Sequence, residues 1–246
     1  MREQASKIYY LVLKDIRTYY LKPPMISWGF MFPGVMILAF YLKNPSGIND
    51  LVPGLIAMTV LFGATSVEAV VITFERRVGT LERLLMAPMG VTSIILGKIM
   101  GGLLFGLASG FVVLLLAILF LGAQVNGLLF LVGIMVLSAF CFAALGALVS
   151  VAVREVFEAM TLSNFLRFPM LFLCGVFFPP AALPMLLKPL AFLLPLTYAV
   201  DGMRSGLSVQ GAMLSLPVNL VILLIFSLLI TAATVKTFIR RLDETS

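Results

Sequence analysis

The stretch FERRVGTLERLLMAP, Phe74 to Pro88, is a charged insert between two long apolar runs. It has the local signals of a short helix with defined ends. Gly79 allows a sharp turn, Thr80 can cap the helix, and Glu82 lies in the first turn, where the helix dipole favours a carboxylate. Pro88 stops the helix at the residue before it. The insert therefore predicts a helix of one to two turns between two membrane-crossing segments.

An apolar stripe runs along this short helix, because Leu81, Leu84 and Leu85 follow the i, i+3, i+4 spacing. Glu82 and Arg83 lie beside the stripe. A helix this short is not stable alone in water, so it must pack against something. Two interpretations remain open at this point: a solvated loop, or a helix that docks a partner protein.

The composition decides the class of protein. The chain has 246 residues, of which 61% are hydrophobic and 11% charged, with a mean hydropathy of +1.13. Soluble domains are typically about 45–50% apolar and about 25% charged. A soluble core could not bury so much apolar surface, so we expect an all-α polytopic membrane protein with one transmembrane domain over residues 1–246.

Several function classes are excluded by residue content. The chain has no histidine, which removes His-based triads and His metal sites, and we find no catalytic set and no metal site. Cys141 and Cys174 both lie in apolar runs, so a disulfide framework is not expected. The net charge of +6 comes from basic residues scattered at span ends, which indicates membrane lipid and not nucleic acid as its counterpart.

Six membrane spans are expected, each close to or above the ~20 residues that cross a bilayer. They are residues 25–42, 51–74, 91–121, 128–153, 162–178 and 214–238. Trp28 would anchor the first span at the membrane interface. The third span is the longest, so its first turns, with Lys98, are expected in the interface. Glycines along it allow close helix packing.

The N-terminal segment, residues 1–24, predicts an amphipathic helix ended by two prolines. Its expected apolar face comprises Ile8, Val12, Ile16 and Tyr19, with Lys7, Lys14 and Arg17 opposite. Such a helix suits the membrane interface. An ordinary basic leader helix is the alternative.

A second unusual stretch covers residues 179–204, which are apolar but interrupted by prolines that forbid one continuous helix. Pro179, Pro184 and Pro195 are among them. Two short helices, 183–187 and 189–194, are expected to form a re-entrant hairpin or a plug at the top of the bundle. Near its end, Asp201 and Arg204 are expected to clasp the hairpin structurally, and a cargo site is the alternative.

Orientation follows from the distribution of Lys and Arg. With the N-terminus inside and six spans, 14 of the 17 basic residues lie on the inner side. Only Lys43, Lys188 and Arg204 lie outside. The positive-inside rule therefore predicts that both termini and residues 75–90 are cytoplasmic, and that the proline-rich hairpin is external.

Two charges are expected inside spans at similar depth, Glu68 in the second and Arg167 in the fifth. A charge facing lipid costs at least ~2.5–3.5 kcal/mol, so both should face protein or water. We hypothesise a Glu68–Arg167 pair, within or between subunits. The alternative is that each is accommodated independently.

The chain carries no recognisable nucleotide-binding loop. At Gly97-Lys98, Thr92 stands where the first Gly of a P-loop is required and Ile99 stands where Ser or Thr is required. If ATP drives this protein, another chain hydrolyses it.

Two motifs together resemble a known family. ERRVGTLERLLMAP followed by Gly97-Lys98 is similar to the first cytoplasmic loop of type-2 ABC exporter permeases. CGVFFPPAALP…LLPLTYAVDGMR, which includes Tyr198, is similar to the outer hairpin of the same family. One departure is Cys174, where the family often has Ser. The resemblance covers nearly the whole chain.

The resemblance implies the membrane half of an exporter in the inner or plasma membrane, without an ATPase site or cofactor of its own. It implies a permease homodimer or heterodimer that pairs with two copies of a separate ABC ATPase, which binds ATP and Mg. The helix from Thr80 would be the coupling helix. Glu82 and Arg83 would meet the ATPase, and Leu81, Leu84 and Leu85 would pack on the membrane domain or in the ATPase cleft.

The composition of the spans gives an indication of the cargo. The spans are rich in Leu, Phe, Met and Gly, which favours a hydrophobic or amphipathic drug or a lipid-like molecule over a long polysaccharide. The alternatives are a permease for a lipid-linked glycan and a secondary transporter or channel that works without an ATPase. An intramembrane enzyme would need a catalytic set that the sequence does not show.

Overall fold

The computed structural model describes residues 2–23, 27, 31–43, 49–87, 89–125, 127–207 and 209–243. Three sequence predictions fall outside these ranges: the role of Trp28 as an anchor, the helix-ending role of Pro24 and that of Pro88. The predicted start of the first span at residue 25 also lies outside them. Every regular element within the described ranges is a helix.

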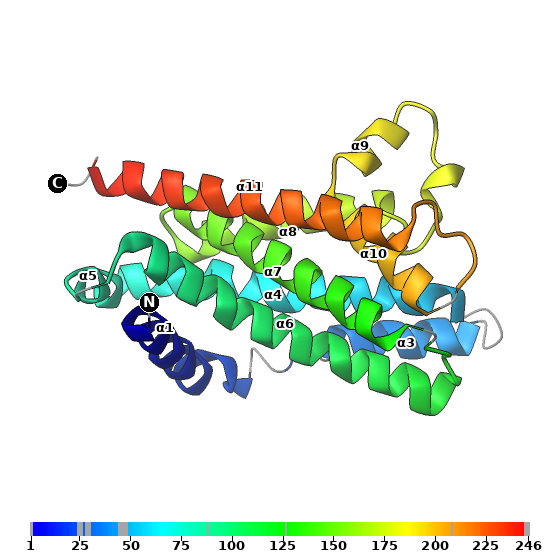
Figure 1. Cartoon of the computed structure of the whole chain (residues 1–246), viewed down its shortest axis with the longest axis horizontal. Coiled ribbons are helices and arrows are strands. Elements are labelled where there is room, and N and C mark those ends of the chain that lie inside the picture. Colours follow the sequence, from blue (N-terminus) through cyan, green and yellow to red (C-terminus); the bar gives the residue numbers. More distant parts are fainter. Residues whose placement is uncertain are drawn as a thin grey trace.

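Five long helices form a bundle and lie roughly side by side along the molecule (Figure 1). They are α4 (Val52–Arg77), α6 (Val91–Leu121), α7 (Leu128–Ala152), α8 (Val156–Leu173) and α11 (Leu216–Asp243). Each is long and apolar enough to cross a membrane. The chain is therefore a multi-pass membrane protein.

The first predicted span, residues 25–42, has a shorter counterpart in the described residues. Helix α3 (Phe32–Lys43) has 12 residues, fewer than the ~20 that a crossing needs. Figure 1 shows α1 (Arg2–Asp15), α5 (Thr80–Leu85) and the C-terminus toward one end of the bundle, and α3 toward the other. Six crossings and inside termini stay predictions.

The central helix is α4, which packs against α6, α7, α8 and α10 (Pro195–Gly206). Its residues from Val52 to Thr65 are all buried. Because α4 is surrounded by protein, its apolar residues form most of the main core with those of α6 and α7. Whatever moves α4 must therefore move its neighbours.

The fifth span begins and ends earlier than the predicted 162–178. Helix α8 begins at Val156 because Glu155 and Glu158 form a capping box that satisfies the first backbone N–H groups. Glu158 lies in the first turn of the helix. The helix ends at Leu173, two residues before Gly175, which has a φ of 88°.

The proline-rich stretch differs most from expectation. Residues 183–187, predicted as a helix, form no helix, and the first turn is a 3-10 turn at Pro180–Ala182. The second predicted helix corresponds to α9 (Lys188–Phe192). The 12-residue helix α10 was missed. It begins with Pro195 at a first-turn position, which proline favours, and its buried face packs on α4, α7 and α11.

Candidate functional site at the α5 end of the bundle

The short helix of the opening stretch is α5, Thr80–Leu85. Only Val78 and Gly79 separate it from α4, and Gly79 makes the turn with a left-handed φ of 72°. Thr80 does not cap the helix as predicted, because Gly79 occupies the N-cap position. The Thr80 hydroxyl instead donates a hydrogen bond of 3.1 Å to the carbonyl of Glu75. This bond fastens α5 to the last turns of α4.

The two sides of α5 have opposite surroundings. Leu81 is buried, and Leu84 and Leu85 pack against the main core. Glu82 and Arg83 are exposed. Met86, directly after the helix, is 79% exposed and was not singled out from the sequence. The helix thus presents a surface of Glu82, Arg83 and Met86 outward while its leucines hold it to the bundle.

Beside α5 lies a group of four charged residues that we call the buried ion cluster: Lys14, Asp15, Glu75 and Lys98. The Lys98 ammonium lies 2.8 Å from an Asp15 oxygen and 2.5 Å from a Glu75 oxygen. Lys14 contacts Asp15 at 3.0 Å and also forms an ion pair with Glu75. The cluster therefore joins α1, α4 and α6 through charges at one end of the bundle.

The electrostatics of the cluster are balanced, with two cations and two carboxylates. Asp15, Glu75 and Lys98 are completely buried, whereas the Lys14 side chain is 42% exposed. Burial by itself would lower the pKa of Lys14, but its hydrogen bond to Glu75 and the charges of Asp15 and Glu75 raise the pKa above its ordinary value. Removing any one buried member would leave an opposite charge without its partner.

Close helix contact brings Asp15 to this cluster. Helix α1 and the π-helical turn Ile16–Tyr20 that follows it lie against α6 at two glycines, one turn apart. A Cβ at Gly97 would come within 2.6 Å of Leu11, and one at Gly101 within 2.3 Å of the Tyr20 hydroxyl. The glycines of this span were predicted to allow close helix packing. In the structure, the N-terminal segment is what packs closely on α6 at Gly97 and Gly101.

The sequence did not indicate the partners of two cluster residues. Lys98, expected in the membrane interface, is fully buried within the protein against Asp15 and Glu75. Lys14, expected opposite the apolar face of the N-terminal helix, is exposed there and also reaches Glu75. A signal was available: Asp15 lies three residues after Val12 and four after Leu11, on the side of the helix that is buried. An acid in an apolar stripe requires a partner.

The hypothesised Glu68–Arg167 pair does not form within the described chain. The Glu68 carboxylate accepts a 2.8 Å hydrogen bond from Tyr20. The Arg167 guanidinium donates to Asn164 at 3.3 Å and lies 5.1 Å from the centre of the Phe62 ring. Phe62 and Glu68 are six residues apart on α4, which places them roughly 120° apart around the helix. Their partners therefore come from different sides of α4.

A second set of contacts ties the same end together. Arg76, next to Glu75 in α4, donates to the carbonyls of Ser150 and Val153 at 3.1 and 2.8 Å. Arg241 on α11 donates to Ala152 at 2.5 Å. These carbonyls belong to the C-terminal end of α7, where cations are favourable. The last turn of α4 is thus connected to α6 on one side and α7 on the other.

The residues assigned to the outer hairpin lie at the opposite end, and several belong to α10. Asp201 accepts hydrogen bonds from the Met213 and Leu214 amides, at 2.6 and 3.0 Å, and from Asn219 at 2.8 Å. Arg204 donates to the Gly175 carbonyl at 3.1 Å. The expected clasp therefore consists of two separate attachments, because neither side chain binds the other.

The remaining hairpin residues have structural surroundings. Tyr198 donates a 2.6 Å hydrogen bond to the Phe192 carbonyl, which joins α10 to α9. Pro195 is buried at the start of α10, whereas Pro179 and Pro184 are exposed. These contacts define the shape of the hairpin.

Several known proteins are similar to this chain in amino-acid sequence. A family profile described as ABC-2 type transporter matches residues 6–208. The inner membrane transport permease YadH of Escherichia coli K12 is 31% identical over 161 residues, which is 65% of this chain and 63% of YadH. ABC transporter G family member 20 of Dictyostelium discoideum is 32% identical over 162 residues, covering 65% of this chain and 22% of that protein.

A third relative matches more of the chain at lower identity. The probable multidrug ABC transporter permease YbhS of Escherichia coli K12 is 24% identical over 215 residues, covering 86% of this chain and 57% of YbhS. The matches thus span less than two thirds of each of these relatives. The family profile covers far more than half of the chain, from α1 to the end of α10. The chain belongs to the ABC-2 type transporter family.

Proposed function

We propose that this chain is the membrane permease subunit of an ATP-driven exporter in an inner or plasma membrane. The observation that carries the proposal is the two-sided setting of α5. Its leucines pack on the bundle, while Glu82, Arg83 and Met86 face outward. A six-residue helix is not stable by itself, so the bundle holds it in a defined position where a second protein can press on it.

The contacts around α5 suggest how a displacement of this helix by a partner would be transmitted to other helices. The Thr80 hydroxyl connects α5 to the Glu75 carbonyl, and the Glu75 side chain pairs with Lys98 on α6. Lys98 pairs in turn with Asp15 on α1. A displacement of α5 would therefore act on three helices at once. Rigid-body movement of packed helices is a common way for a local push to change a whole domain.

The remaining parts of the machine are supplied by partners in this proposal. Two copies of a separate ABC ATPase bind ATP and Mg, and the permease forms a homodimer or heterodimer with the pathway near its axis. One relative carries the name of a probable multidrug permease. Together with the apolar composition of the spans, this favours a hydrophobic or amphipathic drug or lipid-like cargo, moved outward.

The test is coexpression with the ABC ATPase encoded beside this chain, followed by copurification and measurement of ATP turnover. Glu82→Lys, Arg83→Glu and Met86→Asp change exposed side chains only, so the permease should keep its fold. We expect the triple variant to lose most copurifying ATPase. The matched control is Arg154→Glu, which reverses an exposed charge in the link between α7 and α8 and should retain the complex.

Two results would contradict the proposal. One is a wild-type chain that does not associate with the ATPase. The other is a triple variant that associates and turns over ATP as the wild type does. Replacing Leu81 with Asp is not a useful test of docking, because Leu81 is buried and its loss would disturb the bundle itself.

A further inference from the structure

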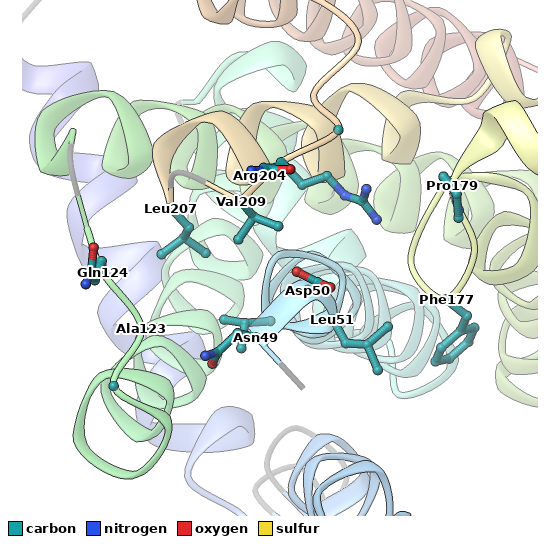
Figure 2. Close-up of a pocket in the computed structure, with 14 residues that line it drawn as sticks. Asn49, Asp50, Leu51, Ala123, Gln124, Phe177, Pro179, Arg204, Leu207 and Val209 are labelled. Atoms are coloured by element: carbon teal, nitrogen blue, oxygen red, sulfur yellow. The ribbon is translucent and has the colours of Figure 1, made fainter. Parts of the chain in front are cut away.

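A cavity of about 790 Å³ lies at the end of the bundle opposite α5. Four separate segments of the chain line it: the turn before α4, the stretch after α6, the segment after α8, and the end of α10 with the residues that follow it. Figure 2 shows their side chains around the opening. Ligand pockets in proteins typically have volumes of about 300–1,000 Å³, so the cavity has room for a small molecule or a lipid head group.

Two opposite charges line this cavity. Asp50 lies at the start of α4, and Arg204 reaches in from α10 (Figure 2). They come from segments far apart in the sequence, and the structure shows no ion pair within 4.0 Å between these two described side chains. The wall thus offers one carboxylate and one guanidinium that are available to a third group.

The hydrogen bonding and the exposure of the two charged side chains support their availability to a ligand. One guanidinium nitrogen of Arg204 is held by the Gly175 carbonyl at 3.1 Å, which fixes the direction of the side chain. The Arg204 side chain lines the cavity and is partly exposed, and Asp50 is exposed. Arg204 is therefore oriented by the fold while part of it stays accessible from the cavity.

The rest of the wall is mixed in character. Asn49, Gln124 and Gln210 add neutral hydrogen-bonding groups, and Leu51, Phe177 and Leu207 add apolar surface. A ligand with a charged head and an apolar or neutral remainder would match such a wall. A purely hydrophobic molecule would leave the polar groups without partners.

We propose that this cavity binds a zwitterionic head group, with a phosphate or carboxylate facing Arg204 and an ammonium facing Asp50. A simple anion would be attracted by Arg204 but repelled by Asp50, and a simple cation would meet the reverse situation. Only a group that carries both charges is complementary to both walls. The inference needs no ATPase coupling, so it stands or falls separately from the proposed function.

Two sources can supply this chemistry. One is a phospholipid with an ethanolamine head group from the adjacent leaflet, and the other is a soluble zwitterion such as phosphoethanolamine. The difference between them is the acyl chains, which only a lipid can place along the apolar part of the wall. Both sources use the same two charged residues.

The experiment is a binding titration of the purified full chain in detergent, followed by native mass spectrometry. The three probes are a short-chain phosphatidylethanolamine, a phosphatidylglycerol with the same chains, and phosphoethanolamine. We expect phosphatidylethanolamine to bind about tenfold more tightly than phosphatidylglycerol, because a hydrogen bond to a charged group is worth about that much. If phosphoethanolamine binds as well, the head group alone suffices.

Variants connect the binding to the cavity. Asp50→Asn should remove the preference for phosphatidylethanolamine, and Arg204→Gln should weaken both lipids. Asp243→Asn removes a carboxylate at the far end of α11 and should leave the preference intact. Thermal melting checks that each variant is folded. Equal binding of the two lipids by the wild type, or an undiminished preference in Asp50→Asn, would overturn the proposal.

Discussion

The ammonium of Lys98 on α6 lies 2.5 Å from the Glu75 carboxylate on α4, and both side chains are only 1% exposed. Each would be costly to bury alone, since an unpaired charge in a low-dielectric interior loses its hydration. The pair is stable there because Asp15 and Lys14 complete a neutral set of four. This links the segment before α5 to two other helices.

The first prediction concerns Lys98. Lys98→Gln removes one of two cations and leaves Asp15 and Glu75 with excess negative charge in a buried site. We expect the free energy of unfolding to fall by about 3–5 kcal/mol, the usual effect of removing one partner of a buried pair. Thermal melting of the detergent-solubilised protein measures this. Lys236→Gln on the exposed side of α11 is the control, and equal melting temperatures for both variants would contradict the role of the cluster.

The second prediction separates the charge of Glu68 from its hydrogen bond. Glu68→Gln keeps an oxygen that accepts from Tyr20, so stability should change by less than about 1 kcal/mol. Glu68→Leu leaves the buried Tyr20 hydroxyl without a partner and should cost about 1–3 kcal/mol. Adding Tyr20→Phe to Glu68→Leu should recover much of this loss. If Glu68→Gln melted as low as Glu68→Leu, the charge itself would be required.

The third prediction tests the contact between α6 and the turn Ile16–Tyr20 that follows α1. In Gly101→Ala the new Cβ would lie 2.3 Å from the Tyr20 hydroxyl, so Tyr20 must move and its bond to Glu68 is lost. We expect a loss of about 1–3 kcal/mol, as for other overpacked sites. Faster tryptic cleavage after the exposed Arg17 would report loosening of the N-terminal segment.

The control for this variant is Gly34→Ala in α3, where a Cβ meets nothing within 4 Å. Alanine is the better helix former, so Gly34→Ala should be neutral or stabilising by up to about 1 kcal/mol. Unchanged cleavage after Arg17 in Gly101→Ala would show that α1 does not depend on this contact.

The fourth prediction concerns Asp201, which accepts three hydrogen bonds ahead of and within α11. Asp201→Asn replaces one acceptor oxygen with a donor that faces other donors. We expect a loss of about 1.5–3 kcal/mol for the bonds to the charged group. Hydrogen exchange at the Met213 and Leu214 amides should accelerate.

Asp50→Asn is a matched control at the same end, because Asp50 is exposed and the described residues show no hydrogen bond to its side chain. It should leave exchange at Met213 and Leu214 unchanged. Exchange that rises equally in both variants would mean that Asp201 does not hold this segment.

Helix positions could be predicted well where local signals are strong. The long helix α6 has the predicted bounds, Val91–Leu121, because Gly90 and Gly122 flank an uninterrupted apolar run. The short helix α5 follows from Gly79 and its leucine stripe. By contrast, α10 was missed, because a dense set of prolines was taken to exclude a helix of 12 residues. A proline in the first turn is compatible with a helix, whereas a proline in the interior of a helix breaks or kinks it.

The candidate site was predictable only in part. The exposed and packed sides of α5 could be read from residue types, since charge and apolar periodicity are local properties. The partners of Asp15, Glu75 and Lys98 could not, because the paired residues lie 23 and 83 positions apart in the chain and meet only through the packing of α1, α4 and α6. The hypothesised Glu68–Arg167 pair does not form within the described chain for the same reason, since similar depth in the bundle says nothing about which side of a helix a residue faces.

The amino-acid sequence by itself determined that this is an α-helical membrane protein, where most of its long apolar helices lie, and that a short charged helix interrupts them. These properties depend on hydrophobicity, helix-ending residues and spacing over neighbouring positions. Only the tertiary structure decided that α4 is the central helix, that Asp15, Glu75 and Lys98 share one buried site, and that Asp50 and Arg204 line one cavity. Such relationships depend on which face each helix turns toward its neighbours. That orientation is determined by contacts between residues distant in the chain.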